Sequence, residues 1–254
     1  MAASQRSHAG RGKESAAERQ ALVLSTLRAC SLIGRWPLHC IETLASHGRL
    51  ERYPSGAQVL ARDPRRREIF VVASGCIELS HSTEKGKKFL LGLLGRGETI
   101  GLARLLPEVQ IVFSHYAHGE TALVHLPVEA MRGVLDSEPI LWRDIAMVAL
   151  GRMLWNVALV REQALSTLSQ RTAGALVSLS RLQGVQESGN LQFRLSQDEL
   201  GTLLGVSRQS ANKELRALEE AGVIRAEYNR IAILDMTKLI DLAGGPAFNP
   251  ASAL

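Results

Sequence analysis

The side chains best suited to recognising another molecule lie in one short stretch, between Leu195 and Arg216. The segment "GVSRQSANKELRALEEAGVI" places arginine, glutamine, asparagine and lysine at neighbouring positions. Arginine can form two hydrogen bonds with the edge of guanine, and glutamine can form two with the edge of adenine. These residue types at this spacing therefore indicate contact with the bases of DNA.

Two short helices with a tight turn between them are predicted to position these side chains. Ser196 and Glu199 have the spacing of a capping box, in which each side chain bonds a backbone N–H at the helix start. Gly205 can adopt the positive φ that a sharp turn requires, and Ser207 is a good N-cap for the second helix. This arrangement is typical of a helix-turn-helix.

The second predicted helix has an apolar stripe of Ala211, Leu215 and Leu218, which leaves its polar side chains facing outward. A solvated helical hairpin on a core is the alternative, but the helix N-terminus also favours phosphate, so DNA binding is preferred. The predicted DNA-contacting residues are Ser196, Gln197, Ser207, Arg208, Gln209, Ser210, Asn212, Lys213 and Arg216.

The composition limits the class of protein. A chain of 254 residues, 46% of them hydrophobic, is expected to form one large or two ordinary domains. It has no apolar run of about 18 residues and no apolar signal-peptide core, so a cytoplasmic protein with no membrane partner is expected. Residues 1–20 are predicted to be a disordered tail, and residues 242–254 a loose tail.

The net charge of +5 is compatible with a nucleic-acid partner but is unevenly distributed. From Arg171 to the end of the chain there are nine basic and nine acidic residues. Attraction to DNA must therefore come from basic residues gathered on one face. The recognition segment shows this locally, since it contains Arg208, Lys213 and Arg216 but only one acidic residue, Glu214.

The middle of the chain changes from helical to strand-like spacing and back. Residues 21–48 have helical apolar spacing. From Leu50 to Leu126, short apolar runs alternate with turn residues about every ten positions, which indicates an antiparallel sandwich or roll.

Residues 136–169 are predicted to form a long helix with two apolar stripes. One stripe contains Leu141, Ile145, Val148, Trp155 and Leu159, and its neighbour contains Trp142, Ala149, Met153, Val157, Val160 and Ala164. A coiled-coil-like pairing with a second copy would cover both stripes. Burial against the roll alone is the alternative.

The C-terminal part completes the helix-turn-helix. "VQESGN" is predicted to be a polar loop and "LQFRL" a short strand, and "VIRAEYNRIAILD" is predicted to form a hairpin that turns at 228–230. Such a hairpin is the wing of a winged helix.

Together these residues resemble the Crp/Fnr family of bacterial transcription regulators, over about residues 21 to 241. The similarity is greatest at 195–227, and "IFVVASGCIEL" and "GRGETIG" resemble the family's roll. The resemblance implies an α+β fold with an N-terminal antiparallel, double-stranded jelly-roll-like β-roll. The implied order is a cyclic-nucleotide-binding-like sensor domain at 21–135, a dimerisation helix at 136–169 and a winged helix-turn-helix at 170–241. The implied partners are double-stranded DNA, a second copy held through 136–169, and RNA polymerase.

The resemblance assigns roles to individual residues of the second helix. Arg208 matches an arginine that reads guanine, and Ser207 and Ser210 match hydroxyls near phosphates. Lys213 matches a basic residue of the major groove, and whether it contacts a base or a phosphate is left open. Gln209 departs from the usual acidic residue, so we expect a different base pair at that position of the DNA site.

The resemblance fails in the effector pocket. Members that bind cyclic AMP carry glutamate after "G-x-x-I-G" and Arg-Ser before the next strand, where this chain has Leu102 and, by alignment, Ile111 and Val112. Apolar side chains cannot replace the ligands of a cyclic phosphate. Cyclic AMP is therefore not expected to bind in the usual manner, and either an apolar effector or none at all is compatible with these residues.

No cofactor and no metal site are predicted. Three cysteines are too few for an iron–sulfur cluster. Cys76 and the histidines at 115, 118 and 125 are possible haem or metal ligands, but structural roles are preferred. The sequence shows no nucleophile motif or phosphate-binding loop of an enzyme. A ligand-binding module that acts through a protein partner is the alternative to a DNA-binding regulator.

Overall fold

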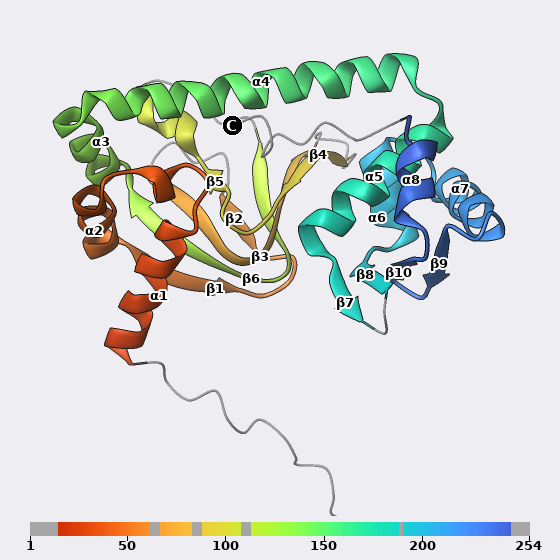
Figure 1. The fold of residues 1–254 in the computed structure, drawn as a ribbon, viewed down its shortest axis with the longest axis horizontal. Coiled ribbons are helices and arrows are strands. Elements are labelled where there is room, and N and C mark those ends of the chain that lie inside the picture. The colour runs from red at the N-terminus through yellow and green to blue at the C-terminus, as the bar shows by residue number, and fades with distance from the viewer. Residues whose placement is uncertain (1–14, 61–66, 83–87, 108–112, 188–189, 245–254) are drawn as a thin grey trace, which may run out of the picture.

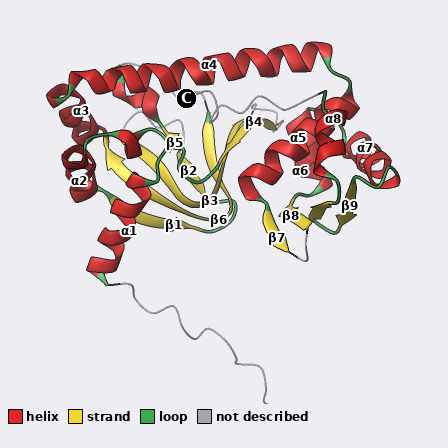
Figure 2. Cartoon of the chain, viewed as in Figure 1, coloured by secondary structure: helices red, strands yellow, loops and turns green. Residues whose placement is uncertain are grey.

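The computed structural model describes residues 15–60, 67–82, 88–107, 113–187 and 190–244. It consists of a sheet-based N-terminal part, a long connecting helix and a mostly helical C-terminal part (Figures 1 and 2). The N-terminal elements up to the long helix are α1 (Ala16–Arg28), η1 (Ile33–Arg35), α2 (Leu38–His47), β1 (Arg49–Tyr53), β2 (Gln58–Leu60), β3 (Glu68–Ser82), β4 (Lys88–Leu94), β5 (Thr99–Ile100), η2 (Leu102–Leu105), β6 (Ser114–Pro127), α3 (Val128–Ser137) and η3 (Pro139–Leu141).

The long helix is α4 (Trp142–Leu165), and the C-terminal part follows it directly. Its elements are α5 (Leu168–Gln183), β7 (Val185–Glu187), β8 (Asn190–Arg194), α6 (Gln197–Leu204), α7 (Arg208–Glu220), β9 (Ile224–Glu227), β10 (Arg230–Ile233) and α8 (Met236–Leu242). The predicted fold class is confirmed: an antiparallel roll, a long helix and a winged helix-turn-helix follow in that order.

The roll is an antiparallel sheet in which β3 and β6 pair along most of their length. The strand order is β1-β6-β3-β4, with β2 beside β6 and β5 beside β3. The register of β3 and β6 shifts on both sides of Ser74, and β-bulges of this kind bend a sheet. Gly75 lies at the bend with φ of +79°, where a Cβ would collide with the backbone of β6.

Alternation along β3 divides the buried residues between two sides of the sheet. Ile69 and Val71 join a core with α1, α2 and α3, whereas Phe70 and Val72 join a core inside the roll. Successive strand residues point to opposite faces, so one apolar run of β3 serves both cores. A third core, around Leu200 and Leu215, holds the C-terminal part together.

Two segments expected to be irregular contain regular structure. Helix α1 begins at Ala16, so the disordered tail predicted for 1–20 is too long. Ser15 and Glu18 form a capping box that starts this helix. Val185–Glu187 forms β7 against β8, which corrects the polar loop predicted for this stretch. In the described residues, no helix is both long enough and apolar enough to cross a membrane.

Helix α4 covers the sheet with one side only. Val148 is buried and Trp155 half-buried, and a Cβ at Gly92 would lie 2.8 Å from the indole of Trp155, so β4 leaves space for this ring. The first of the two stripes predicted from the sequence thus faces the sheet at these positions. Trp142, predicted on the neighbouring stripe, also packs on the core that β3 shares with α1, α2 and α3.

The other side of α4 exposes large apolar side chains. Met147, Leu150, Leu154 and Val157 are between 46% and 60% exposed and follow one another at spacings of three, four and three residues. Met153 and Val160 flank them and are also exposed. Three-four spacing is that of a coiled-coil seam. The outer stripe therefore runs through Leu150 and Leu154, which the prediction from sequence omitted.

A buried histidine links three strands of the roll. The ring of His125 on β6 has no exposed surface; it hydrogen-bonds with Tyr53 at 2.8 Å and with Glu68 at 3.2 Å. Arg49 donates to Glu68 at 2.7 Å. Burial by itself raises the pKa of Glu68, but Arg49 and His125 outweigh it and hold this pKa below its ordinary value of 4.5. His125, which the sequence suggested as a possible haem or metal ligand, is thus part of a structural network.

Replacing Glu68 by Gln should destabilise the fold at neutral pH by about 1–3 kcal/mol, because Arg49 and His125 lose a charged acceptor. A carboxylate with a lowered pKa stabilises the fold above its unfolded pKa, and this contribution disappears as the pH falls through the folded value. The difference between Glu68→Gln and the wild type should therefore shrink below about pH 4. Urea unfolding at about pH 7 and about pH 3.5 measures this difference in the free energy of unfolding.

The matched control is Glu129→Gln, which removes the same charge from an exposed ion pair with Arg67. This change should cost less than about 1 kcal/mol at either pH. An equal loss of stability for Glu68→Gln at both pH values would contradict the electrostatic account.

Candidate nucleic-acid interface

Helices α6 and α7 are held at a fixed angle by local backbone features. Ser196 and Glu199 form the predicted capping box at the start of α6. Gly205 ends this helix with φ of +70°, the left-handed conformation that glycine adopts without strain. A Cβ added at Gly201 would lie 3.0 Å from the backbone oxygen of Val206, so α6 and the turn are in close contact.

Helix α7 has one side buried in the core and the other exposed to solvent. Ala211, Leu215 and Leu218 are buried, as predicted. The Ser207 hydroxyl accepts from the backbone N–H of Ser210 at 3.1 Å, which caps the helix. The charged and amide side chains of the first turns lie outside this core. The exposed ones are Arg208, Gln209, Lys213 and Arg216.

The side chains at the start of the two helices form a network that the sequence did not predict. The amide of Gln197 donates to Asn212 at 3.1 Å, and its oxygen accepts from Arg208 at 3.3 Å. Asp198 forms an ion pair with Arg208 at 3.5 Å. Asn212 is half-buried and already bonded, whereas Arg208 keeps 65% of its side chain exposed. The network thus brings together residues ten or more positions apart, which spacing alone does not reveal.

The hairpin of β9 and β10 forms the predicted wing beside α7. Tyr228 and Asn229 make its tip; Asn229 has φ of +55° and Tyr228 is 95% exposed. The Lys238 side chain donates to the carbonyl of Ala221 and so joins α8 to the end of α7. Tyr228 was not among the predicted contacts, although the sequence placed it at the turn of the predicted hairpin.

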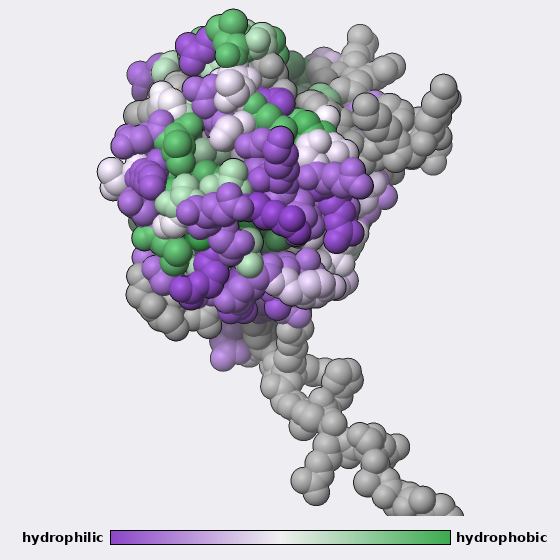
Figure 3. All heavy atoms as spheres, turned by 90° about the vertical axis from the view of Figure 1, so that its right-hand side faces the viewer, coloured by the Kyte–Doolittle hydropathy of each residue, from purple (hydrophilic) through white to green (hydrophobic). Residues whose placement is uncertain are grey.

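Figure 3 views the molecule from the end that carries α7 and α8. Hydrophilic residues cover much of this face, and smaller hydrophobic areas lie between them. Arg208, Lys213 and Arg216 are exposed and bring positive charge to α7, as expected from the sequence. Such a face can contact the phosphates and base edges of a duplex.

The predicted effector residues are only partly within the described chain. Leu102 opens η2, is half-buried and packs on the core shared with α1, α2 and α3. Ile111 and Val112 lie outside the described residues. An apolar pocket formed by all three therefore stays a prediction.

The segment before Leu102 is held by the long helix. Arg152 on α4 donates to the carbonyl and hydroxyl oxygens of Thr99 and pairs with Glu98 at 3.6 Å. Burial lowers the pKa of Arg152, and the carboxylate of Glu98 opposes this change. A displacement of 98–101 would thus act directly on α4.

Comparison with known protein families identifies both halves of the chain. A Crp-like helix-turn-helix domain matches residues 170–242, and a cyclic nucleotide-binding domain matches residues 50–138. The two matches together cover more than half of the chain and coincide with the winged part and the roll.

Individual relatives match along most of their length. The "Cyclic AMP receptor protein" of Thermus thermophilus is 27% identical over 207 residues, which are 82% of this chain and 94% of the relative. The "cAMP-activated global transcriptional regulator CRP" of Salmonella typhimurium is 22% identical over 200 residues, 76% of this chain and 93% of the relative. Among solved structures, a transcriptional regulator of the CRP/FNR family from Thermus thermophilus superposes with a TM-score of 0.68 at 25% identity. That match covers 78% of this chain and 99% of the regulator.

Proposed function

Because this chain belongs to the Crp/Fnr family of DNA-binding transcription regulators, we propose that it acts as a homodimer on a palindromic operator. The observation that carries this proposal is the exposed polar face at the start of α7. The proposed dimer works on DNA in the cytoplasm and contacts RNA polymerase. The proposal also holds that the protein is not an enzyme.

We assign recognition of the operator's base sequence to Arg208. Its guanidinium can bind O6 and N7 of a guanine together, and Gln209 beside it suits adenine. Ser207 and Ser210 lie at the helix N-terminus, where hydroxyl and backbone N–H groups favour phosphate. Asp198 holds Arg208 in the free protein, so binding exchanges this ion pair for a base contact.

The dimer forms through the exposed side of α4. An apolar seam along this helix is provided by Met147, Leu150, Leu154 and Val157. Pairing with the same seam of a second copy removes these side chains from water and relates the two copies by a two-fold axis. Two α7 helices then enter successive major grooves about 34 Å apart.

The sensor responds to a molecule other than cyclic AMP, or to none. Leu102 stands where the ribose-binding glutamate of cyclic-AMP-binding members is expected, and an isobutyl group offers no acceptor for a hydroxyl. The relatives named for cyclic AMP support the fold of this domain, but the ligand is a property of the residues that line its pocket. Arg152 carries any change at 98–101 to α4.

Replacing Arg208 by Ala should weaken binding to the preferred operator by about 1–3 kcal/mol and abolish discrimination at one G·C pair per half-site. The loss follows from removing both hydrogen bonds to guanine. Fluorescence anisotropy with a panel of operators, each changed at one base pair, measures it. Equal weakening on every duplex would instead assign Arg208 to a phosphate.

Two further variants separate charge from base reading. Arg181→Ala removes an exposed arginine from the end of α5 and should leave the discrimination intact. Asp198→Asn releases Arg208 from its ion pair and removes a negative charge near the duplex. It should tighten binding to all sequences while the guanine preference persists. Loss of that preference would show that Asp198 is needed to orient Arg208.

Replacing Val157 by Glu should convert the dimer to monomers, because the seam would have to bury two carboxylates. We expect the dimer dissociation constant to rise about 100-fold or more, as measured by sedimentation velocity. Val185→Glu is the matched control, since Val185 is 65% exposed on β7, away from α4. An unchanged dimer for Val157→Glu would place the interface elsewhere.

A further inference from the structure

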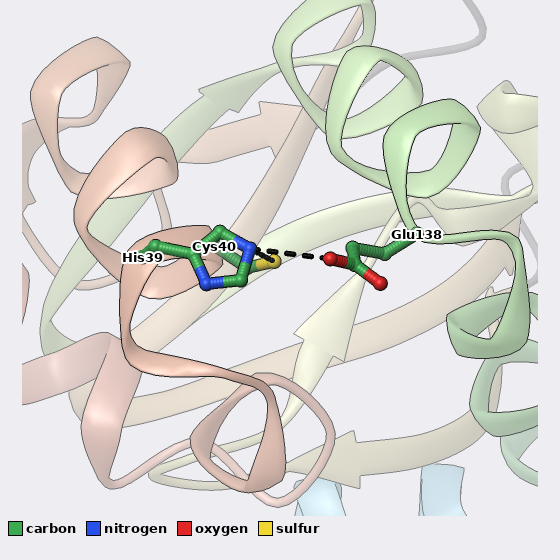
Figure 4. Close-up of side chains that lie close together, drawn as sticks. All are labelled: His39, Cys40 and Glu138. Atoms are coloured by element: carbon green, nitrogen blue, oxygen red, sulfur yellow. Dashed lines mark hydrogen bonds and ion pairs between the residues drawn. The ribbon is translucent and has the colours of Figure 1, made fainter.

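The sensor part carries a cluster of three metal-binding side chains at the end remote from α7. His39 and Cys40 lie in the first turn of α2, and Glu138 lies between α3 and η3. Figure 4 shows the three side chains converging from these two segments. The Nε2 atom of His39 lies 3.3 Å from Sγ of Cys40 and 3.3 Å from Oε1 of Glu138. All three donor atoms lie within 4.8 Å of one another.

We propose that His39, Cys40 and Glu138 bind one zinc ion. Zinc bonds thiolate, imidazole and carboxylate at about 2.0–2.3 Å, so two ligands of a tetrahedral ion lie about 3.3–3.6 Å apart. The two separations of 3.3 Å fall in this range. The donor atoms of the third pair, Cys40 and Glu138, lie within 4.8 Å of each other and would move to this spacing on binding.

The chemistry of the donors selects among metals. A thiolate and an imidazole are poor ligands for magnesium and calcium, which prefer oxygen atoms. They suit zinc and related transition metals, and zinc adopts the tetrahedral geometry that this spacing fits. Three protein ligands leave a fourth position, which water can fill.

A hydrated ion can reach this cluster from solvent. The side chain of His39 is 68% exposed, and both His39 and Cys40 line a groove of about 470 Å³ between α2 and α3. Cys40 is only 1% exposed, so its thiolate would bind the ion from the protein side. His47 and Glu129 line the same groove but are not part of the cluster.

Bound zinc would reinforce a junction that the fold already contains. Glu138 immediately precedes η3, which leads into α4, and the indole N–H of Trp36 donates to Asp144 on α4 at 3.1 Å. The metal would therefore add a second link between the α2 region and the start of α4. This site was not expected from the sequence, because the third ligand lies 98 positions from Cys40.

The test uses the full-length, tag-free protein, reduced with a phosphine and stripped of metal by a chelator. Titration with zinc chloride against a chromophoric competitor should show one site per chain. Cobalt(II) in place of zinc should produce thiolate-to-cobalt absorption in the near ultraviolet. Zinc should also raise the melting temperature, because it binds only the folded arrangement.

Single variants with matched controls identify the ligands. His39→Ala and Glu138→Gln should weaken zinc binding about tenfold or more, while His47→Ala and Glu129→Gln in the same groove should leave it unchanged. Cys40→Ser should abolish the thiolate-to-cobalt absorption. His39 is largely exposed, so its variant is expected to fold normally. The proposal would be overturned if the wild-type protein bound zinc no more tightly than His39→Ala. It would also be overturned if the cobalt protein showed no thiolate-to-cobalt absorption.

Discussion

Helix α4 has two apolar sides, and the residues that the structure describes cover only one of them. The inner side packs on the roll around Val148 and Trp155, and β4 carries Gly92 where the indole needs room. The outer side leaves Leu150, Leu154 and Val157 half or more exposed. Exposed apolar side chains at coiled-coil spacing are stabilised by pairing with a similar helix. This one helix thus joins the roll to the winged part and leaves an apolar seam exposed between them.

The same helix offers a physical connection between the sensor and the DNA-contacting part. Arg152 bonds the segment that leads into η2, and α4 passes into α5 through a capping box at Thr167. A second contact runs from the roll itself, because Leu93 on β4 packs against the C-terminal core and a Cβ at Gly95 would lie 3.0 Å from Leu182. Figure 1 shows α4 spanning both parts. A change in the roll thus has two routes to α6 and α7.

The sequence predicted those features whose signals are local. The capping box of Ser196 and Glu199, the positive φ of Gly205 and the apolar stripe of α7 depend on residues within one or two helical turns, and all three are present. The capping box of Ser15 and Glu18 has the same spacing, but the polar composition of residues 1–20 predicts a tail instead. Local spacing is therefore informative even within a polar segment.

Features that depend on distant contacts were not predictable in the same way. The ion pair of Asp198 with Arg208 requires the angle between α6 and α7, and the network around His125 requires the register of β1 and β6. The two apolar stripes predicted on α4 omitted Leu150 and Leu154, and periodicity alone does not show which stripe the sheet covers. The DNA contacts and the effector pocket stay predictions, since they concern molecules that the chain alone does not contain.

The central claim is that two copies of α7 read a palindrome without cyclic AMP. Selection of duplexes from a randomised library, with the purified protein at near-physiological salt, tests it most directly when run with and without cyclic AMP. We predict the same palindrome in both arms, with half-site centres about 10 base pairs apart and a guanine for Arg208 in each. A palindrome that appears only with cyclic AMP would show a working nucleotide site despite Leu102 and would contradict this account.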